Sequence, residues 1–216
     1  MLNITNKKLL MIAPHVDDEI GGIPLILRLQ KEGWECHIVY FSFCEKSVVA
    51  LGFKKEDFVA ENKKVLQLLG IQQSCVHYFD YPVREFSQHR QCILEDLIQM
   101  RQQLHPSLVI TPSTGDVHQD HKTVNEETIR CFKNSATIIG FTYPWNEVDK
   151  TTHNLFIEVN ASVLDTIGTV IDCYKVQKAR KYMSPEIFRA ISIATGVKVH
   201  LPHAFSYEII RMRYPF

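Results

Sequence analysis

The chain has 216 residues, of which 45% are hydrophobic and 22% charged, as is typical of a soluble globular protein. Its 24 basic and 24 acidic residues balance, and no basic stripe is present, which argues against nucleic acid or an anionic membrane as partner. No apolar stretch approaches the roughly 18 residues of a membrane span, and no signal peptide is recognisable. Six scattered cysteines without a CxxC pair predict free thiols and a cytoplasmic protein.

The first part of the chain alternates between strand and helix patterns. Residues 8–13 are an apolar run that predicts a buried strand, and residues 19–32 have an apolar face at helical spacing that ends at Gly33. Residues 36–43 are rich in Val, Ile, Tyr and Phe, which predicts a second strand. This order is a βαβ unit, in which the strands run parallel and the crossover is right-handed.

The same alternation continues to the end of the chain. Further helices are predicted at 55–69, 88–104, 121–133, 161–176 and 185–194, with Gly70 and Gly196 ending the first and the last. Further strands are predicted at 75–79, 108–110, 136–143, 154–159 and 205–212, with a loop at 111–113 and a polar loop after 143. No repeat or linker interrupts residues 1–216. We therefore expect a single α/β domain with three layers, a mostly parallel sheet and helices on both faces.

Two clusters of histidine and carboxylate residues follow predicted strands. Residues 14–19 read PHVDDE after the strand at 8–13, and residues 116–121 read DVHQDH after the strand at 108–110. In parallel α/β sheets, ligands bind beyond the carboxyl ends of the strands. Both clusters are expected at that edge, so together they predict a divalent-metal site built from two loops.

The residue types suit a catalytic zinc site, which keeps three protein ligands and one open position. His15 and Asp18 would supply two ligands from the first cluster, and either His121 or His118 would supply the third from the second. A metal bound in this way lowers the pKa of its water to about 7. The pattern therefore indicates hydrolysis.

A hydrolytic site also needs a base and a group that stabilises developing charge. Asp17 lies beside the expected ligands without being one of them, so it fits the general base. The histidine that does not bind metal would stabilise the oxyanion or protonate the leaving group. Asp120 would orient that histidine through a ring nitrogen.

These two motifs, together with Gly21-Gly22, resemble the paired signatures of the LmbE/PIG-L-like zinc de-N-acetylases. Residues 61–70 resemble the family's Glu…Leu-Gly helix, and residues 178–184 resemble its Lys-Ala-x-x-Tyr-x-Ser segment. The resemblance touches residues 9–22, 61–70, 107–124 and 178–184. It implies a Rossmann-like α/β domain that removes acetyl groups from N-acetylglucosamine units of glycolipids, thiol-sugar conjugates, chito-oligosaccharides or glycopeptides.

The resemblance also implies the role of each residue in the two clusters. It implies that zinc, or another divalent transition metal, is the cofactor and that a small molecule or glycoconjugate is the substrate. A homo-oligomer is compatible with it. Carried over by position, the zinc ligands are His15, Asp18 and His121, the base is Asp17, the proton donor and charge stabiliser is His118 with Asp120 behind it, and Glu19 and Asp116 are supporting residues.

The chain departs from the family's pattern at three places. Val16 stands where the family usually has Pro, and His203-Ala204-Phe205 stands where members often have Ala-Glu-x-Phe. Many members carry a substrate-contacting arginine after the second strand, but residues 41–60 contain only lysines as basic residues. Lysine keeps the charge without the bidentate fork. The last two departures concern the choice of substrate and leave the metal ligands unchanged.

Other functions compete with hydrolysis. Asp17 and Asp18 would suit a helix start, and Gly21-Gly22 would suit a phosphate site, although no GxGxxG or Walker pattern is present. His15 and Asp17 with a distant histidine would suit an Fe(II) triad, which usually sits on a jelly roll. The last alternative is a non-catalytic metal- or sugar-binding module, which would have no use for an unliganded carboxylate at Asp17.

The remaining aromatic and histidine residues are interpreted as structural. Phe141, Tyr143 and Trp145 are assigned to strand and core in preference to a sugar platform, although their neighbours Asn146 and Glu147 keep a carbohydrate contact open. The histidines outside the two clusters are interpreted as ordinary polar residues at His37, His77, His89, His105 and His153, while His200 and His203 stay open as substrate or supporting residues.

Overall fold

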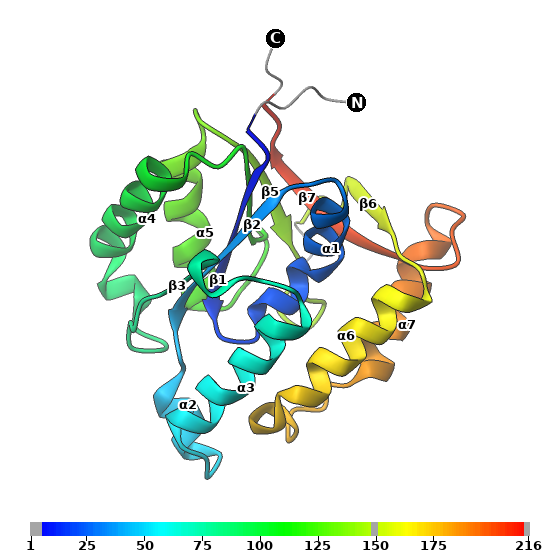
Figure 1. The fold of residues 1–216 in the computed structure, drawn as a ribbon, viewed down its shortest axis with the longest axis horizontal. Helices are drawn as coiled ribbons and strands as arrows, with labels where there is room; N and C mark the ends of the chain where they lie inside the picture. The colour runs from blue at the N-terminus through cyan, green and yellow to red at the C-terminus, as the bar shows by residue number, and fades with distance from the viewer. Residues whose placement is uncertain (1–5, 148–150, 214–216) are drawn as a thin grey trace.

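A seven-stranded sheet forms the centre of the computed structural model, which describes residues 6–147 and 151–213 (Figure 1). Its spatial order is β3-β2-β1-β4-β5-β7-β6, and every pair is parallel except the two that β7 makes with β5 and β6. The prediction of a mostly parallel α/β sheet is therefore confirmed. The strands are β1 Lys8–His15, β2 Glu35–Ser42, β3 Val76–Tyr78, β4 Leu108–Pro112, β5 Thr137–Phe141, β6 Leu155–Glu158 and β7 Ala204–Arg211.

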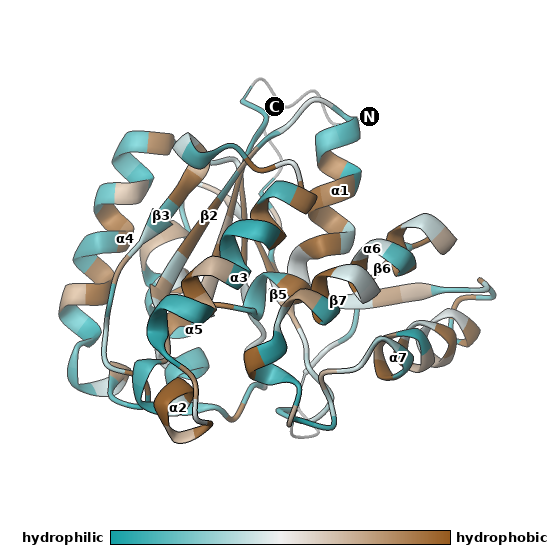
Figure 2. Ribbon diagram, turned by 60° about the horizontal axis from the view of Figure 1, so that its bottom comes forward, coloured by the Kyte–Doolittle hydropathy of each residue, from teal (hydrophilic) through white to brown (hydrophobic). Residues whose placement is uncertain are grey.

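Helices cover both faces of this sheet (Figure 1). Apolar residues of α1, α3 and α6 pack in one core cluster, and those of α4 and α5 pack in a second. The central strands are largely hydrophobic, whereas the helices carry hydrophilic residues as well (Figure 2). The helices are α1 Ile23–Lys31, α2 Glu45–Ala50, α3 Lys55–Leu68, α4 Arg90–Leu104, α5 Gln119–Phe132, α6 Ala161–Cys173 and α7 Pro185–Val197.

The strand β1 shows why the apolar runs of this sequence form central strands. Leu9 and Met11 face the first core cluster, and Leu10 and Ile12 face the second. All four side chains are fully buried. A strand covered by helices on both faces needs apolar residues at every position, not only at alternate ones.

The predicted helix at 19–32 is divided in the structure. Residues 18–22 form a 3₁₀ turn, and α1 begins only at Ile23. The turn brings Gly21 so close to Phe141 that a Cβ at Gly21 would lie 2.5 Å from the ring. The double glycine therefore lets the chain after β1 approach β5, which explains why the helix begins later than its apolar pattern.

Several other element boundaries differ from the prediction. The loop predicted at 111–113 is wrong for Thr111 and Pro112, which pair with β5. The helix α6 ends at Cys173, before the predicted 176, and the short helix α2 was not predicted. The polar loop predicted after 143 includes residues 148–150, which lie outside the described residues.

The described part of the chain has no helix that is long and apolar enough to cross a membrane. Its six cysteines are all free, as predicted, and four of them are buried. The other two, Cys92 and Cys173, are exposed and partly exposed.

Gly196 does not end the last helix, as the sequence had suggested, because α7 continues to Val197. It allows the returning chain to pass, since a Cβ at Gly196 would lie 2.4 Å from the carbonyl oxygen of Leu201. A Cβ at Gly168 of α6 would lie at an ordinary 3.4 Å from Pro185.

We expect Gly196→Ala to lower the free energy of unfolding. The collision with backbone costs about 1–3 kcal/mol, which exceeds the helix gain of about 0.5–1 kcal/mol from replacing glycine. The matched control Gly168→Ala has the same gain without the collision and should raise stability. Urea unfolding of both variants measures the difference, and equal shifts would contradict the packing explanation.

Candidate active site

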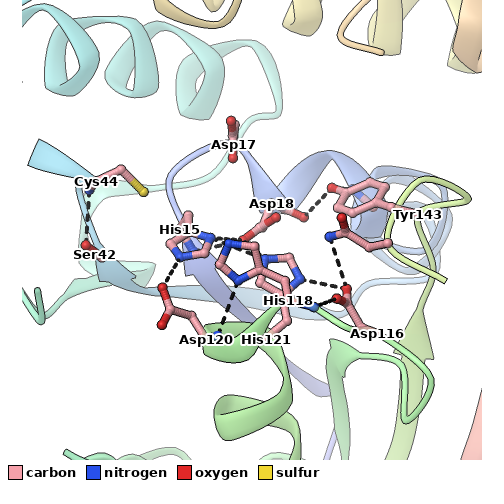
Figure 3. A network of polar contacts seen from close by, with 12 residues as sticks. His15, Asp17, Asp18, Ser42, Cys44, Asp116, His118, Asp120, His121 and Tyr143 are labelled. Atoms are coloured by element: carbon pink, nitrogen blue, oxygen red, sulfur yellow. Dashed lines mark hydrogen bonds and ion pairs between the residues drawn. The ribbon is translucent and has the colours of Figure 1, made fainter. Parts of the chain in front are cut away.

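The two His/Asp clusters meet at the carboxyl end of the sheet. The first lies at the end of β1, and the second lies between β4 and the start of α5. The strands β1 and β4 are neighbours, although β2 and β3 lie between them in sequence. Strands β2 and β3 are added on one side of β1, and β4 and β5 on the other. At such a reversal of strand order, α/β folds form a crevice for ligands. Both clusters contribute to a cavity of about 280 Å³ (Figure 3).

Three ligand-type atoms form a nearly equilateral triangle in this cavity. His15 Nδ1 lies 3.2 Å from Asp18 Oδ2 and 3.2 Å from His121 Nε2. The remaining edge, from His121 Nε2 to Asp18 Oδ2, is also 3.2 Å. All three side chains are buried.

This triangle fits a tetrahedral transition-metal ion. Ligand atoms about 2.0–2.1 Å from zinc in a tetrahedron lie roughly 3.3 Å apart, close to the three distances observed. Two imidazoles and one carboxylate also match a catalytic donor set that leaves a fourth position open. His15, Asp18 and His121 are therefore the residues that could hold the metal.

Each of the two histidines of the triangle is held by a buried carboxylate on its other ring nitrogen. Asp120 Oδ2 lies 3.0 Å from His15 Nε2, and Asp116 Oδ2 lies 2.7 Å from His121 Nδ1. Such contacts select the tautomer and ring orientation that metal binding requires. The structure differs here from the sequence-based hypothesis, because the Asp120 carboxylate orients His15 and not His118.

His118 is the N-cap residue of α5, which begins two residues earlier than predicted. Its Nδ1 accepts the backbone N–H of Asp120 at 3.2 Å. The neutral ring therefore carries its proton on Nε2, as a donor. Burial, followed by the charges of His15 and His121, lowers the pKa of His118 to about 4.

A metal site of three histidines is the geometric alternative, since nitrogens of His15, His118 and His121 lie within 4.8 Å of one another. Binding through His118 would leave its ring without a proton on either nitrogen, because Nδ1 already accepts a hydrogen bond. Asp18 Oδ2 lies 3.2 Å from the ligand atoms of both histidines, and a carboxylate binds metal without losing a ring proton. The geometry therefore favours Asp18 as third ligand.

Asp17 faces the cavity apart from the three histidine rings (Figure 3). Its Oδ2 accepts a hydrogen bond from Gln177 Nε2 at 2.5 Å. Burial, followed by the charges of Asp18 and Glu19, raises the pKa of Asp17 well above its usual value. An Fe(II) triad with Asp17 as ligand is not formed, because Asp18 takes the place beside both histidines.

The backbone of Asp17 is held in an uncommon conformation, with φ of +95°. Its N–H donates to Glu19 Oε2 at 3.1 Å, and Glu19 Oε1 in turn accepts the hydroxyl of Tyr174 at 2.5 Å. Burial raises the pKa of Glu19 to about 7. A left-handed non-glycine residue costs about 1–3 kcal/mol and marks functional sites. The carboxylate of Glu19 thus holds the backbone of Asp17 in this conformation.

One wall of the cavity is an aromatic stack. The rings of Tyr143 and Trp145 lie 4.9 Å apart, and those of Trp145 and Tyr182 lie 4.6 Å apart, close to parallel in both pairs. The interpretation as core holds for Phe141, which is fully buried. Tyr143 belongs to the same core cluster and Trp145 packs against it, but both rings also line the cavity.

Two arginines from outside the two His/Asp clusters also line the cavity. Arg84 lies in the loop before α4, and its backbone N–H donates to Asp120 Oδ2 at 2.6 Å. Arg180 follows α6 and donates to the hydroxyl of Tyr182 at 2.6 Å. Gln177 and Cys44 are further lining residues that the sequence did not predict. Arg180 lies within the family-like segment 178–184, which was its one signal in the sequence, whereas Arg84, Gln177 and Cys44 carried no local signal.

The two histidines left open by the sequence lie elsewhere. Neither His200 nor His203 is among the residues lining the cavity. His203 Nδ1 lies 3.0 Å from the hydroxyl oxygen of Ser192 in α7. A role in contacting substrate is therefore not supported for them.

We expect Asp116→Asn to weaken metal binding by about 10- to 100-fold, as is common when a carboxylate behind a metal-bound histidine is lost. An amide cannot reproduce the charge-assisted contact to His121 Nδ1. Competition with a chromogenic chelator measures the affinity. The exposed Asp165→Asn in α6 is the control, and equal affinities for the two variants would contradict this role of Asp116.

Comparisons with known proteins show similarity in sequence and in fold. A family model, PIG-L, described as GlcNAc-PI de-N-acetylase, matches residues 10–132, which is more than half of the chain. None of the curated proteins matches the sequence.

Solved structures share the fold at low identity. The N,N'-diacetylchitobiose deacetylase from Pyrococcus horikoshii is 18% identical, with 95% of this chain and 84% of that chain covered and a TM-score of 0.72. A zinc-inhibited form of teicoplanin deacetylase Orf2 is 12% identical, with 93% and 97% covered and a TM-score of 0.76. The 4-carboxy-2-hydroxymuconate hydratase from Pseudomonas putida KT2440 is 18% identical, with 97% and 98% covered and a TM-score of 0.74.

Proposed function

Because the chain belongs to the PIG-L family of de-N-acetylases, we propose that it is a zinc-dependent hydrolase that removes an N-acetyl group from an amino-sugar conjugate. One observation carries this proposal. Three buried ligand atoms form a triangle with edges of 3.2 Å, and an unliganded carboxylate, Asp17, faces the same cavity. A module that only binds metal would have no use for that carboxylate.

A divalent ion held by His15, Asp18 and His121 would lower the pKa of water and polarise the amide carbonyl. Asp17 accepts the proton of the attacking water, and its raised pKa allows it to hold that proton and pass it to the leaving amine. The products are acetate and the free amine. This assigns Asp17 both proton transfers at the reacting centre.

His118 stabilises the charge that develops on the carbonyl oxygen. Its pKa of about 4 keeps the ring neutral near pH 7. Since Nδ1 accepts the N–H of Asp120, the ring presents Nε2–H as a fixed hydrogen-bond donor. We therefore assign His118 the charge-stabilising part of its expected role, and the proton transfer to the amine falls to Asp17.

The wall of the cavity supports a sugar conjugate as substrate. An exposed aromatic ring offers a flat apolar surface to a pyranose face. Both faces of Trp145 are covered by Tyr143 and Tyr182, so the partly exposed Tyr182 at the end of the stack would be the ring for this contact. Arg84 and Arg180 offer the guanidinium groups that the region after β2 lacks. We propose an N-acetylglucosamine-type unit as the substrate group, and we expect the enzyme in the cytoplasm.

The test measures acetate released from a panel of N-acetylglucosamine conjugates, with and without a chelator and after addition of Zn²⁺. We expect release that the chelator abolishes and zinc restores. A hydratase shares this fold, and fold alone does not decide function. Absence of acetate release from the metal-loaded protein with every conjugate would overturn the proposal and favour a binding module or another reaction.

A further inference from the structure

A second group of metal-ligating side chains lies at the opposite end of β2 from the cavity. Glu35 and His37 come from the start of β2, and Cys75 and His77 come from the turn before β3 and from β3 itself. The other end of β2, at Ser42, pairs with His15 of the cavity. Seven residues of strand, or roughly 23 Å, separate Glu35 from Ser42. The group is therefore distinct from the catalytic cluster.

The register of two strands places these residues together. Ile38 pairs with Val76 and Val39 with His77 in the parallel ladder. His37 and His77 therefore lie on the face opposite to that of Ile38 and Val76, and Cys75 ends the 3₁₀ turn just before β3. Ligand-type atoms of Glu35, His37 and Cys75 lie within 4.8 Å of one another. Side chains from β2 and from the turn before β3 thus converge, and His77 adjoins them through His37.

The imidazole rings of His37 and His77 are in contact through one ring nitrogen of each. His37 Nδ1 lies 3.3 Å from His77 Nε2, with the rings nearly parallel. Glu35 Oε1 lies 2.7 Å from the other nitrogen of His37, Nε2. A carboxylate that holds the proton on Nε2 leaves Nδ1 as a lone pair, which is the form of histidine that binds metal.

We propose that His37 Nδ1, His77 Nε2 and the thiolate of Cys75 bind a second transition-metal ion of the zinc class, with Glu35 holding His37 in place. The nitrogen separation of 3.3 Å equals the distance of roughly 3.3 Å between ligands of tetrahedral zinc. Two imidazoles and a thiolate select a borderline-soft ion such as Zn²⁺ or Co²⁺ over Mg²⁺ or Ca²⁺. His37 and Cys75 are buried, so the site is partly shielded from water.

The effect of this ion is structural. The strand β3 has three residues and forms one edge of the sheet, where β2 is its sheet neighbour. An ion shared between His37 of β2 and both Cys75 and His77 fastens this short edge strand. Metal binding that occurs only in the folded protein raises its stability.

The donor sets make the two sites distinguishable by spectroscopy. The proposed ligand set includes a thiolate, whereas His15, Asp18 and His121 contain no sulfur. Co²⁺ bound to thiolate shows a charge-transfer band in the near ultraviolet. Cys44 lines the catalytic cavity and Cys36 is the sequence neighbour of His37, so Cys44→Ser and Cys36→Ser are the matched controls for Cys75→Ser.

The experiment titrates the metal-free, reduced full-length protein with Co²⁺ and with Zn²⁺. We expect two equivalents to bind and a thiolate band to appear in wild type, Cys36→Ser and Cys44→Ser. Cys75→Ser should bind one equivalent less and lose the band. His77→Gln, at a partly exposed position, should weaken binding of that equivalent at least 10-fold while the chain stays folded by circular dichroism.

The second equivalent must also be independent of the catalytic site. His121→Ala should keep the thiolate band, which separates a failure of this site from a failure of the proposed deacetylase. A wild-type protein that binds a single equivalent without a thiolate band would overturn the second site. So would a band that survives in Cys75→Ser, and the group would then be a hydrogen-bonded relay between Glu35, His37 and His77.

Discussion

Asp17→Asn is expected to slow acetate release by about 10²–10⁴-fold, the usual contribution of a general base, while the protein keeps its full content of metal. The amide cannot accept the proton of the attacking water. Asp17 is not one of the three atoms of the ligand triangle, so metal binding does not depend on its charge.

The substitution is also mild for the structure. The Asn side-chain oxygen can still accept the hydrogen bond from Gln177 Nε2. Asn tolerates the positive φ of this position better than most residues. Metal analysis and thermal unfolding of Asp17→Asn serve as controls beside the assay. Turnover equal to wild type would remove Asp17 from the mechanism.

His121→Ala is expected to lose both metal and activity. The variant removes one of three ligands, so its metal affinity should fall by more than the roughly 10–100-fold that follows loss of a carboxylate behind a ligand. Asp116 also loses the partner that it holds at 2.7 Å. Zinc content after dialysis and acetate release measure the two effects.

His118→Ala is the matched comparison, because it removes a neighbouring histidine from the same motif. We expect it to keep the metal and to slow acetate release by about 10²–10³-fold, the usual effect of losing one donor to an oxyanion. A variant at His118 that loses metal, beside a variant at His121 that keeps it, would exchange the two roles. Circular dichroism of both variants excludes unfolding as the cause.

The sequence could predict those parts of the site that are local. His15 ends β1 and Asp18 begins the 3₁₀ turn that follows, so a tight turn brings both side chains to one point. Apolar runs without alternation indicated buried parallel strands, since both faces of such strands are covered. The place of the second cluster followed from the rule that parallel strands end at a common edge.

Features that depend on tertiary contacts could not be predicted. Spacing could not distinguish His118 from His121, because the distinction lies in which ring nitrogen already accepts a hydrogen bond. The aromatic stack and Arg180 reach the cavity from segments that follow β5. Hydrophobic periodicity does not predict where such loops fold back. A glycine at position 196 suggested the end of a helix. The structure gives another reason for the glycine, because a side chain there would collide with the backbone of Leu201.

The separation of the metal ligands along the chain sets an order of events during synthesis. His15 and His121 come from segments 106 residues apart that meet only after β4 has paired beside β1. A growing chain that ends before α5 has two of the three ligands and no third. Since the amino-terminal part of a chain emerges first and the proposed metal site would form only with the fold, the set of ligands would be completed late. Until α5 is in place, the nascent amino-terminal segment would offer an ion only two ligands and no enclosing cavity.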